Sequence, residues 1–207
     1  MIHATTHGGV TTLTLDRPDK ANALTEAMLR DLLKAVTAAK DAPALILTGT
    51  GRVFSAGADL DAARAGLATS PVWEELSGAI AAHPGLSIAA LTSTVAGGAN
   101  GMVLACELRI AVPGAKFFYP VMKLGFLPQP SDPVRMTALI GAARTKWMLM
   151  AGQRIDTDQA LAFGLVDQIV PADALLEQAH ALCADCVAAD RKTARAIKAL
   201  CQQDSPR

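Results

Sequence analysis

A buried strand that leads through a glycine turn into a helix occurs twice in this sequence, and the repetition constrains the fold more than any other feature. In the first copy, an apolar strand at residues 44–47 leads through glycine turns to a helix start at Asp59. In the second copy, a strand at residues 88–91 is followed by Gly97 and Gly98 and then by a small, apolar helix. The order strand, strand, helix recurs along the chain, and this recurrence predicts an α/β fold built from stacked ββα turns.

The residues at these turns suggest a binding site for a group that carries negative charge. Ala56, Gly57 and Ala58 are small, so a ligand can approach the backbone closely at the first turn. The first N–H groups of the helix that follows have no partner within the helix. Such groups stabilise charge that develops during a reaction. For one turn alone, a tightly packed turn without a ligand is an equally open interpretation.

Composition and charge limit the classes of protein to which the chain can belong. With 207 residues, 51% of them hydrophobic, and no interior linker, the chain predicts a single domain over residues 1–207. A formal net charge of +0 without a basic block argues against nucleic acid or a membrane surface as a partner. The sequence has neither an apolar run of roughly 20 residues nor a secretory signal pattern.

The four cysteines predict a reducing, cytoplasmic setting, because they form no regular framework. Cys183 and Cys186 make one C-x-x-C pair in an alanine-rich helical segment. Without a second pair, this spacing favours core or surface thiols over a redox motif or half of a zinc site. We therefore expect no metal site.

Local signals predict several elements along the chain. Alternating residues 10–15 follow two glycines and predict the second strand of a hairpin. Thr25 is the expected N-cap of the next helix. Ser131 or Asp132 is expected to cap a later helix. A final helix is expected through most of residues 172–201.

Four motifs, in order, resemble those of the crotonase superfamily, also called the enoyl-CoA hydratase/isomerase family. The resemblance extends from Leu13 to about Leu200. It implies a crotonase-like spiral of stacked ββα units and homo-oligomers based on trimers. It also implies a bent acyl-CoA substrate in fatty acid metabolism, with coenzyme A as part of the substrate and no separate cofactor. The motifs are LDRP with NAL in residues 15–24, FSAGADL at 54–60, CELRIA at 106–111, and GQRI with GLV in residues 152–166.

The resemblance also implies roles for individual residues. By position, the backbone N–H groups of Ala58 and Gly98 would bind the thioester oxygen and stabilise an enolate. The side chains of Arg17 and Lys20 could reach the phosphates of CoA or remain solvated loop charges. Backbone around the first two motifs would bind adenine and pantetheine, which points to Lys20, Ala21, Ala23, Ala56, Asp59 and Leu60.

The sequence departs from the family pattern at the positions of the acids. Gly101 and Val121 stand where hydratases carry glutamates, and Gln129 stands where other branches carry an acid. Glycine and valine cannot transfer a proton, so hydration by two glutamates is not expected.

Few residues could replace these acids. We rank Asp132 first and Tyr119 second, although an N-cap is an alternative role for Asp132. Lys123 also flanks the second position, whereas Glu107 is expected to be structural.

Two interpretations of the function follow from the resemblance. The first is a lyase or isomerase of the enoyl-CoA hydratase/isomerase type that acts through an enolate. The second is a catalytically inactive acyl-CoA-binding or assembly subunit, and a pure scaffold is a third. Family members usually continue for several more helices, so residues 172–207 are expected to form a shortened helical segment. The pocket would then be more open, or a neighbouring subunit would close it.

Overall fold

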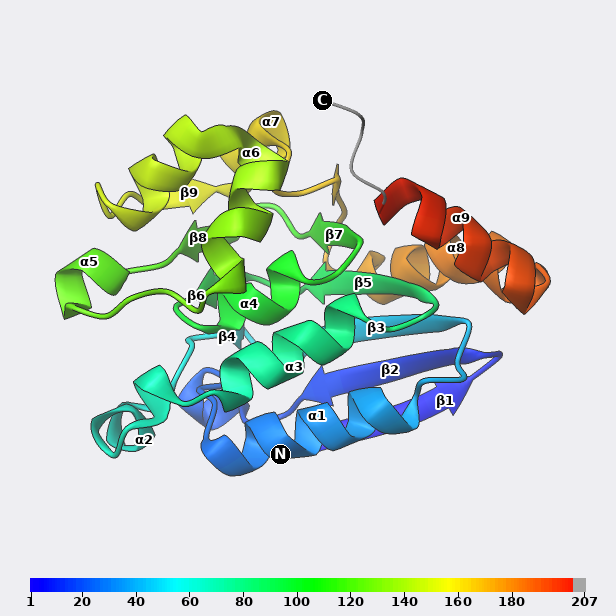
Figure 1. The fold of residues 1–207 in the computed structure, drawn as a ribbon, viewed down its shortest axis with the longest axis horizontal. Coiled ribbons are helices and arrows are strands. Elements are labelled where there is room, and N and C mark those ends of the chain that lie inside the picture. Colours follow the sequence, from blue (N-terminus) through cyan, green and yellow to red (C-terminus); the bar gives the residue numbers. More distant parts are fainter. Residues whose placement is uncertain (203–207) are drawn as a thin grey trace.

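The computed structural model describes residues 1–202. Its larger sheet has six strands in the order β1-β2-β3-β5-β7-β10 (Figure 1). The first two strands form an antiparallel hairpin, as the alternating sequence predicted, and the remaining neighbours pair in parallel. The central strand β3 is buried along its whole length, as is typical of a parallel strand covered on both faces. The strands are β1 (Ile2–His7), β2 (Val10–Leu15), β3 (Ala44–Gly49), β5 (Leu86–Leu91), β7 (Leu108–Ala111) and β10 (Gln168–Ile169).

A second, smaller sheet has the order β4-β6-β8-β9. Its first three strands are parallel, and β9 pairs antiparallel with β8. From β3 to α5, each turn of the chain adds one strand to the large sheet, one to the small sheet and then helical structure. This order confirms the predicted α/β fold of stacked ββα units. The strands are β4 (Val53–Ser55), β6 (Thr94–Ala96), β8 (Lys116–Phe118) and β9 (Ile155–Asp156).

Helices cover the large sheet. Helices α1 and α3 pack together in front of it in Figure 1. Helix α4 contacts α3 and lies next to the small sheet. Helix α8 contacts β3 and β5. None of the described helices has the length and apolar character needed to cross a bilayer. The helices are α1 (Glu26–Ala38), α2 (Leu60–Arg64), α3 (Val72–Ala81), α4 (Ala99–Leu104), α5 (Val121–Leu124), α6 (Ser131–Leu149), α7 (Thr157–Phe163), α8 (Leu175–Ala188) and α9 (Arg191–Gln202), with 3-10 turns at Pro18–Lys20 and Leu67–Thr69.

Of the two predicted helix caps, one is confirmed and one is wrong. Thr25 caps α1, since its hydroxyl accepts a hydrogen bond from the N–H of Met28. The predicted cap of α6 by Ser131 or Asp132 is wrong: Pro130 occupies the N-cap position, and no side chain caps this end. The side chain of Asp132 is instead buried and turned towards another element.

One further prediction needs correction. The expected helix over residues 172–201 is split into α8 and α9, which are separated by a break after Ala188. Residues 203–207 of the predicted C-terminal segment lie outside the described residues.

Candidate active site

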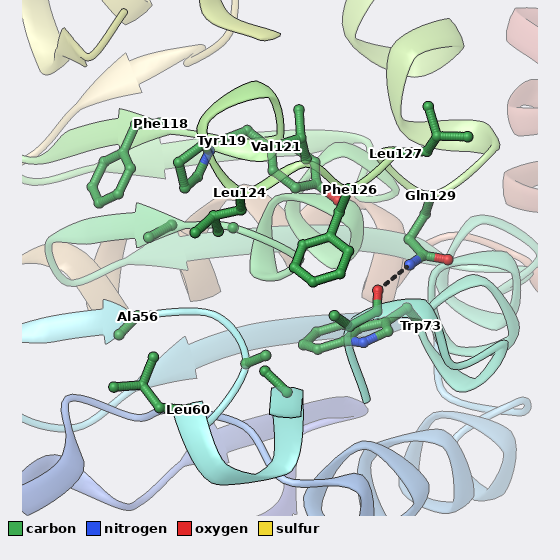
Figure 2. Close-up of a pocket in the computed structure, with 17 residues that line it drawn as sticks. Ala56, Leu60, Trp73, Phe118, Tyr119, Val121, Leu124, Phe126, Leu127 and Gln129 are labelled. Atoms are coloured by element: carbon green, nitrogen blue, oxygen red, sulfur yellow. Dashed lines mark hydrogen bonds between the residues drawn. The ribbon is translucent and has the colours of Figure 1, made fainter. Parts of the chain in front are cut away.

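An apolar cavity of about 280 Å³ lies where the two glycine turns meet the chain around α5. Figure 2 shows Leu124 and Phe126 on one side of it, facing Ala56, Leu60 and Trp73 on the other. Tyr119 is the only titratable side chain among the described residues that line the cavity. The cavity therefore suits an uncharged, apolar group.

The two glycine turns touch each other at this cavity. Gly57 and Gly97 both have positive φ, +88° and +55°, a conformation that side chains other than glycine rarely adopt. A Cβ atom on Gly57 would lie 2.8 Å from the carbonyl oxygen of Ala96 and 3.3 Å from the Cα of Gly97. The turns can approach this closely only because Gly57 has no side chain.

Ala58, in the first turn, is one of the residues that line the cavity. The N–H groups on either side of it are occupied: Gly57 donates to Ser55 Oγ and Asp59 donates to the carbonyl oxygen of Leu24. Within residues 1–202, the N–H of Ala58 donates to no protein acceptor. It is left available to a ligand.

The second turn presents Gly98 in the same way. The N–H of Gly97 donates to the carbonyl oxygen of Phe118, whereas that of Gly98 finds no protein acceptor in the described part of the chain. Trp73 packs on Gly98, so a Cβ there would lie 3.2 Å from the indole ring. The indole is held by a 2.8 Å hydrogen bond from its Nε1 to the carbonyl oxygen of Leu67. The two predicted donors, Ala58 and Gly98, thus line one cavity.

Asn22 fixes the loop of the first motif against the turn of the second. Its side chain is fully buried, and its Nδ2 donates to the carbonyl oxygens of Thr50 and Val53, both at 2.8 Å. Its Oδ1 accepts from the N–H of Arg17, and its carbonyl oxygen accepts from Ser55 Oγ. Asn22 belongs to the first motif, but the sequence alone indicated no role for its side chain. Only the buried partners show that it shapes the turn that carries Ala58.

Arg17 also joins these two loops. Its Nη1 donates to Asp59 Oδ2 at 2.8 Å and to the carbonyl oxygen of Ala23 at 3.0 Å. The hydrogen bond from Arg17 is the main reason that the pKa of Asp59 lies below its usual value. Asp59 Oδ1 meanwhile caps α2. Arg17 therefore braces the loop instead of standing free in solvent, while Lys20 is exposed.

The other residues expected to hold CoA lie along the same pair of loops. The N–H of Ala56 donates to the carbonyl oxygen of Ala21, which brings the two loops side by side. Ala56 and Leu60 line the cavity, and Leu60 is exposed. The structure thus brings the predicted CoA-binding segments together next to the cavity.

Tyr119 and Asp132 form a hydrogen-bonded pair behind the cavity wall. Tyr119 Oη donates to Asp132 Oδ2 at 2.9 Å. Burial raises the pKa of Asp132 to about 6; the hydrogen bond from Tyr119 and the charge of Arg135 lower it in part, and the charge of Glu74 raises it. Burial, together with the neighbouring carboxyl, raises the pKa of Tyr119 as well, so the phenol is neutral.

The positions where an acid was expected lie around this pair. Gly101 on α4 lies against the carboxyl group of Asp132. Val121 and Gln129 line the cavity, and Gln129 Nε2 donates to the carbonyl oxygen of Ala68 at 3.5 Å, the dashed line in Figure 2. Asp132 itself is fully buried and does not line the cavity, whereas Tyr119 does.

The two remaining candidates lie elsewhere. Lys123 is exposed on α5. Glu107 forms an ion pair of 2.6 Å with Lys198 and accepts a 2.7 Å hydrogen bond from the N–H of Ser87. These contacts agree with the structural role predicted for Glu107.

Comparison with known proteins places these features in a family. The family model described as "Enoyl-CoA hydratase/isomerase" matches residues 5–206. The chain is similar to "Probable enoyl-CoA hydratase echA8" of Mycobacterium bovis, with 35% identity over 176 residues that cover 82% of this chain and 68% of that protein. It is 34% identical to the carnitinyl-CoA dehydratase of Citrobacter koseri over 191 residues, which cover 87% of this chain and 72% of that protein.

A solved structure shows the same architecture. Enoyl-CoA hydratase EchA8_6 from Mycobacterium marinum superposes with a TM-score of 0.87 at 28% identity. The superposition covers 97% of this chain and 98% of that one.

Proposed function

The chain belongs to the enoyl-CoA hydratase/isomerase family, and from this membership we propose that it acts on an acyl-CoA thioester through an enolate. The backbone N–H groups of Ala58 and Gly98 bind the thioester oxygen. One observation carries this proposal: two residues that line the same apolar cavity, from two turns in contact, have N–H groups without a protein acceptor among residues 1–202.

The chemistry of the proposed step follows from this arrangement. Removal of a proton next to the thioester carbonyl moves negative charge onto the carbonyl oxygen. Two N–H groups already in place stabilise that charge, and one such donor is worth about 3 kcal/mol. No charged side chain of the described residues lines the cavity, so the backbone donors supply the stabilisation at the oxygen.

We assign the CoA portion of the substrate to the loops next to the cavity. Backbone of the two adjacent loops contacts the adenine and pantetheine, and Lys20, which is exposed, is available to a phosphate. CoA enters as part of the substrate, and the proposal includes no further cofactor. Homo-oligomeric assembly is likewise a proposal. The CoA-binding residues would be Lys20, Ala21, Ala23, Ala56, Asp59 and Leu60.

A second candidate function is binding of acyl-CoA without turnover. It is favoured by the glycine and valine at positions 101 and 121 and by the presence of a single titratable side chain on the cavity wall within the described residues. The first candidate requires that this side chain, or one behind it, moves a proton.

The experiment that tests the proposal is ¹³C NMR of butanoyl-CoA labelled at the thioester carbon, with and without the protein. We expect a downfield shift of the carbonyl signal on binding, because the two N–H groups polarise the carbonyl. Binding without a shift would contradict the assignment of Ala58 and Gly98. Exchange of the hydrogens next to the carbonyl with D₂O then distinguishes an enzyme from a binding subunit.

A further inference from the structure

Asp132 is buried in a way that its position in α6 does not explain. Its side chain is fully buried, and within residues 1–202 its Oδ1 has no hydrogen-bond partner. A buried polar atom without a partner costs free energy, so such atoms in native structures call for an explanation. The usual reason for an aspartate in the first turn of a helix is capping, and Asp132 caps nothing here.

The carboxyl group of Asp132 lies in a space that a glycine leaves open. A Cβ atom on Gly101 would lie 2.9 Å from Asp132 Oδ1 and 3.2 Å from Oδ2. Any other residue at position 101 would therefore displace the carboxyl group. Gly101 belongs to α4, and its N–H donates to the carbonyl oxygen of Gly98, which is the N-cap of that helix and lines the cavity. The carboxyl group thus packs one helical turn away from a proposed thioester donor.

Tyr119 connects this carboxyl group to the cavity. Tyr119 is one of the residues that line the cavity, and its hydroxyl donates to Asp132 Oδ2. No other titratable side chain of the described residues lines that wall. A proton that leaves a substrate in the cavity and reaches Asp132 therefore passes through the hydroxyl of Tyr119.

We propose that Tyr119 and Asp132 form a single proton relay, in which the Tyr119 hydroxyl exchanges a proton with the acyl chain and Asp132 is the terminal acceptor. This relay rests on the proposed acyl-CoA function. The C–H bond next to the thioester carbonyl breaks, and its electron pair enters the enolate held by the N–H groups of Ala58 and Gly98. The proton passes to Tyr119 Oη as the original hydroxyl proton passes to Asp132 Oδ2.

The reverse movement returns the proton to the acyl chain, either at the same carbon or at the far end of a conjugated enolate. The relay therefore suits a shift of a double bond within an unsaturated acyl chain, which needs one proton-handling unit. Addition of water requires a second group to activate the water, and the described residues on the cavity wall offer none. The structure thereby favours isomerisation over hydration.

The groups that face Asp132 allow it to accept a proton near neutral pH. Tyr119 and Arg135 favour its charged form, whereas burial and the charge of Glu74 oppose that form. A terminal acceptor works best when its pKa lies close to the working pH. Within this relay Tyr119 is the catalytic residue and Asp132 acts through it.

The test measures proton exchange and carbonyl polarisation in one sample of protein, D₂O and butanoyl-CoA labelled with ¹³C at the thioester carbon. The variants are Tyr119→Phe, Asp132→Asn and the double variant. We expect each single variant to exchange about 10²–10⁴-fold more slowly than the wild type while the carbonyl shift is retained. The double variant should match the slower single variant, because the two residues act as a unit. Asp158→Asn, at an exposed acid on α7, is the control and should exchange at the wild-type rate.

The outcomes separate the relay from the function on which it rests. Wild-type exchange rates in Tyr119→Phe or Asp132→Asn, with the carbonyl shift retained, would overturn the relay alone. A wild-type carbonyl shift without any exchange would also overturn the relay and leave a binding protein. If the wild type shows no carbonyl shift, the proposed function fails and the relay fails with it.

A measurement on the wild type covers the case in which a variant does not fold. Exchange needs ionised Asp132, so its rate should fall about tenfold per pH unit below about pH 6 and level off above it. A rate that is constant from about pH 5 to about pH 8 would overturn the relay.

A single-substrate reaction gives a second check of the same proposal. We expect the wild type to convert a 3-enoyl-CoA into the conjugated 2-enoyl-CoA, as measured by the ultraviolet absorbance of the product. The same protein should hydrate a 2-enoyl-CoA far more slowly. Hydration as fast as isomerisation would contradict a single relay.

Discussion

Tyr119, directly after β8, donates a 2.9 Å hydrogen bond to Asp132 in the first turn of α6. The bond joins a residue of the cavity wall to a fully buried carboxyl group. That carboxyl group lies against Gly101 on α4, the helix whose N-cap is Gly98. The relationship links the proposed thioester donors to a group able to accept a proton.

Replacing Gly98 tests the thioester donor directly. Gly98→Pro and Gly98→Ala both place a Cβ 3.2 Å from the ring of Trp73, but only proline removes the N–H. We expect Gly98→Pro to turn over about 10²–10³-fold more slowly than Gly98→Ala and to lose part of the carbonyl shift. Steady-state kinetics and ¹³C NMR provide the two measurements. Equal behaviour of the two variants would count against Gly98 as a donor.

The contact between Gly101 and Asp132 predicts an energetic coupling. Gly101→Ala should destabilise the fold by about 1–3 kcal/mol, because the new Cβ would lie 2.9 Å from Asp132 Oδ1. In the background of Asp132→Ala the same substitution should cost less, because the carboxyl group is gone. Urea unfolding of both single variants and the double variant measures the coupling, expected at about 0.5–3 kcal/mol. Additive effects would show that the two residues do not compete for this space.

The raised pKa of Asp132 predicts a dependence of stability on pH. Burial raises the pKa of the carboxyl group from its ordinary value of 3.8 to about 6 in the folded protein, so the folded state binds the proton more tightly than the unfolded state. Stability from this group is greatest at low pH and falls as pH rises from about 4 to about 6. Relative to the wild type, Asp132→Asn should therefore gain about 3 kcal/mol over this interval. Denaturant unfolding at several pH values measures the difference, and a difference independent of pH would contradict it.

We expect substitution of Asn22 to destabilise the fold more than substitution of most other polar residues of the site. Asn22→Ala leaves the carbonyl oxygens of Thr50 and Val53 and the N–H of Arg17 without their present partner. Each unsatisfied buried group costs about 1–3 kcal/mol, so we expect a large loss of stability and weaker acyl-CoA binding. Asn22 has a φ of +52°, and Asn22→Gly keeps that conformation accessible while removing the same bonds. A similar loss in both variants, by thermal unfolding, would assign the effect to the side chain; a loss only in Asn22→Ala would assign it to the backbone.

The lining of the cavity predicts a preference among acyl groups. No charged side chain of the described residues faces it, so a charged acyl group would lose hydration without gaining a partner. We expect butanoyl-CoA to bind at least about tenfold more tightly than succinyl-CoA, which carries a carboxylate at the end of a chain of the same length. Calorimetric titration compares the two ligands, and free CoA is the control for binding by the nucleotide portion. Equal affinity for both acyl groups would place the acyl chain outside this cavity.

The sequence predicted the fold class and much of the local structure, because both depend on patterns among nearby residues. Alternation over residues 10–15 predicted β2, and a hydroxyl before an amphipathic run predicted that Thr25 caps α1. The recurring strand, strand and helix predicted the stacked ββα units. The glycine turns suggested a donor site, because the chemistry of a turn lies within a few consecutive residues, and the family resemblance implied Ala58 and Gly98 as the donors.

Only the tertiary structure decided how the remaining groups of the site are used. Local sequence suggested that Asp132 caps α6, yet packing turns its carboxyl group towards Tyr119 and into the space beside Gly101. Arg17 could not be assigned a partner until Asp59, 42 residues away, was placed beside it. Hydrogen-bond partners, burial and the resulting pKa depend on which segments pack together, and residues distant in sequence determine that packing.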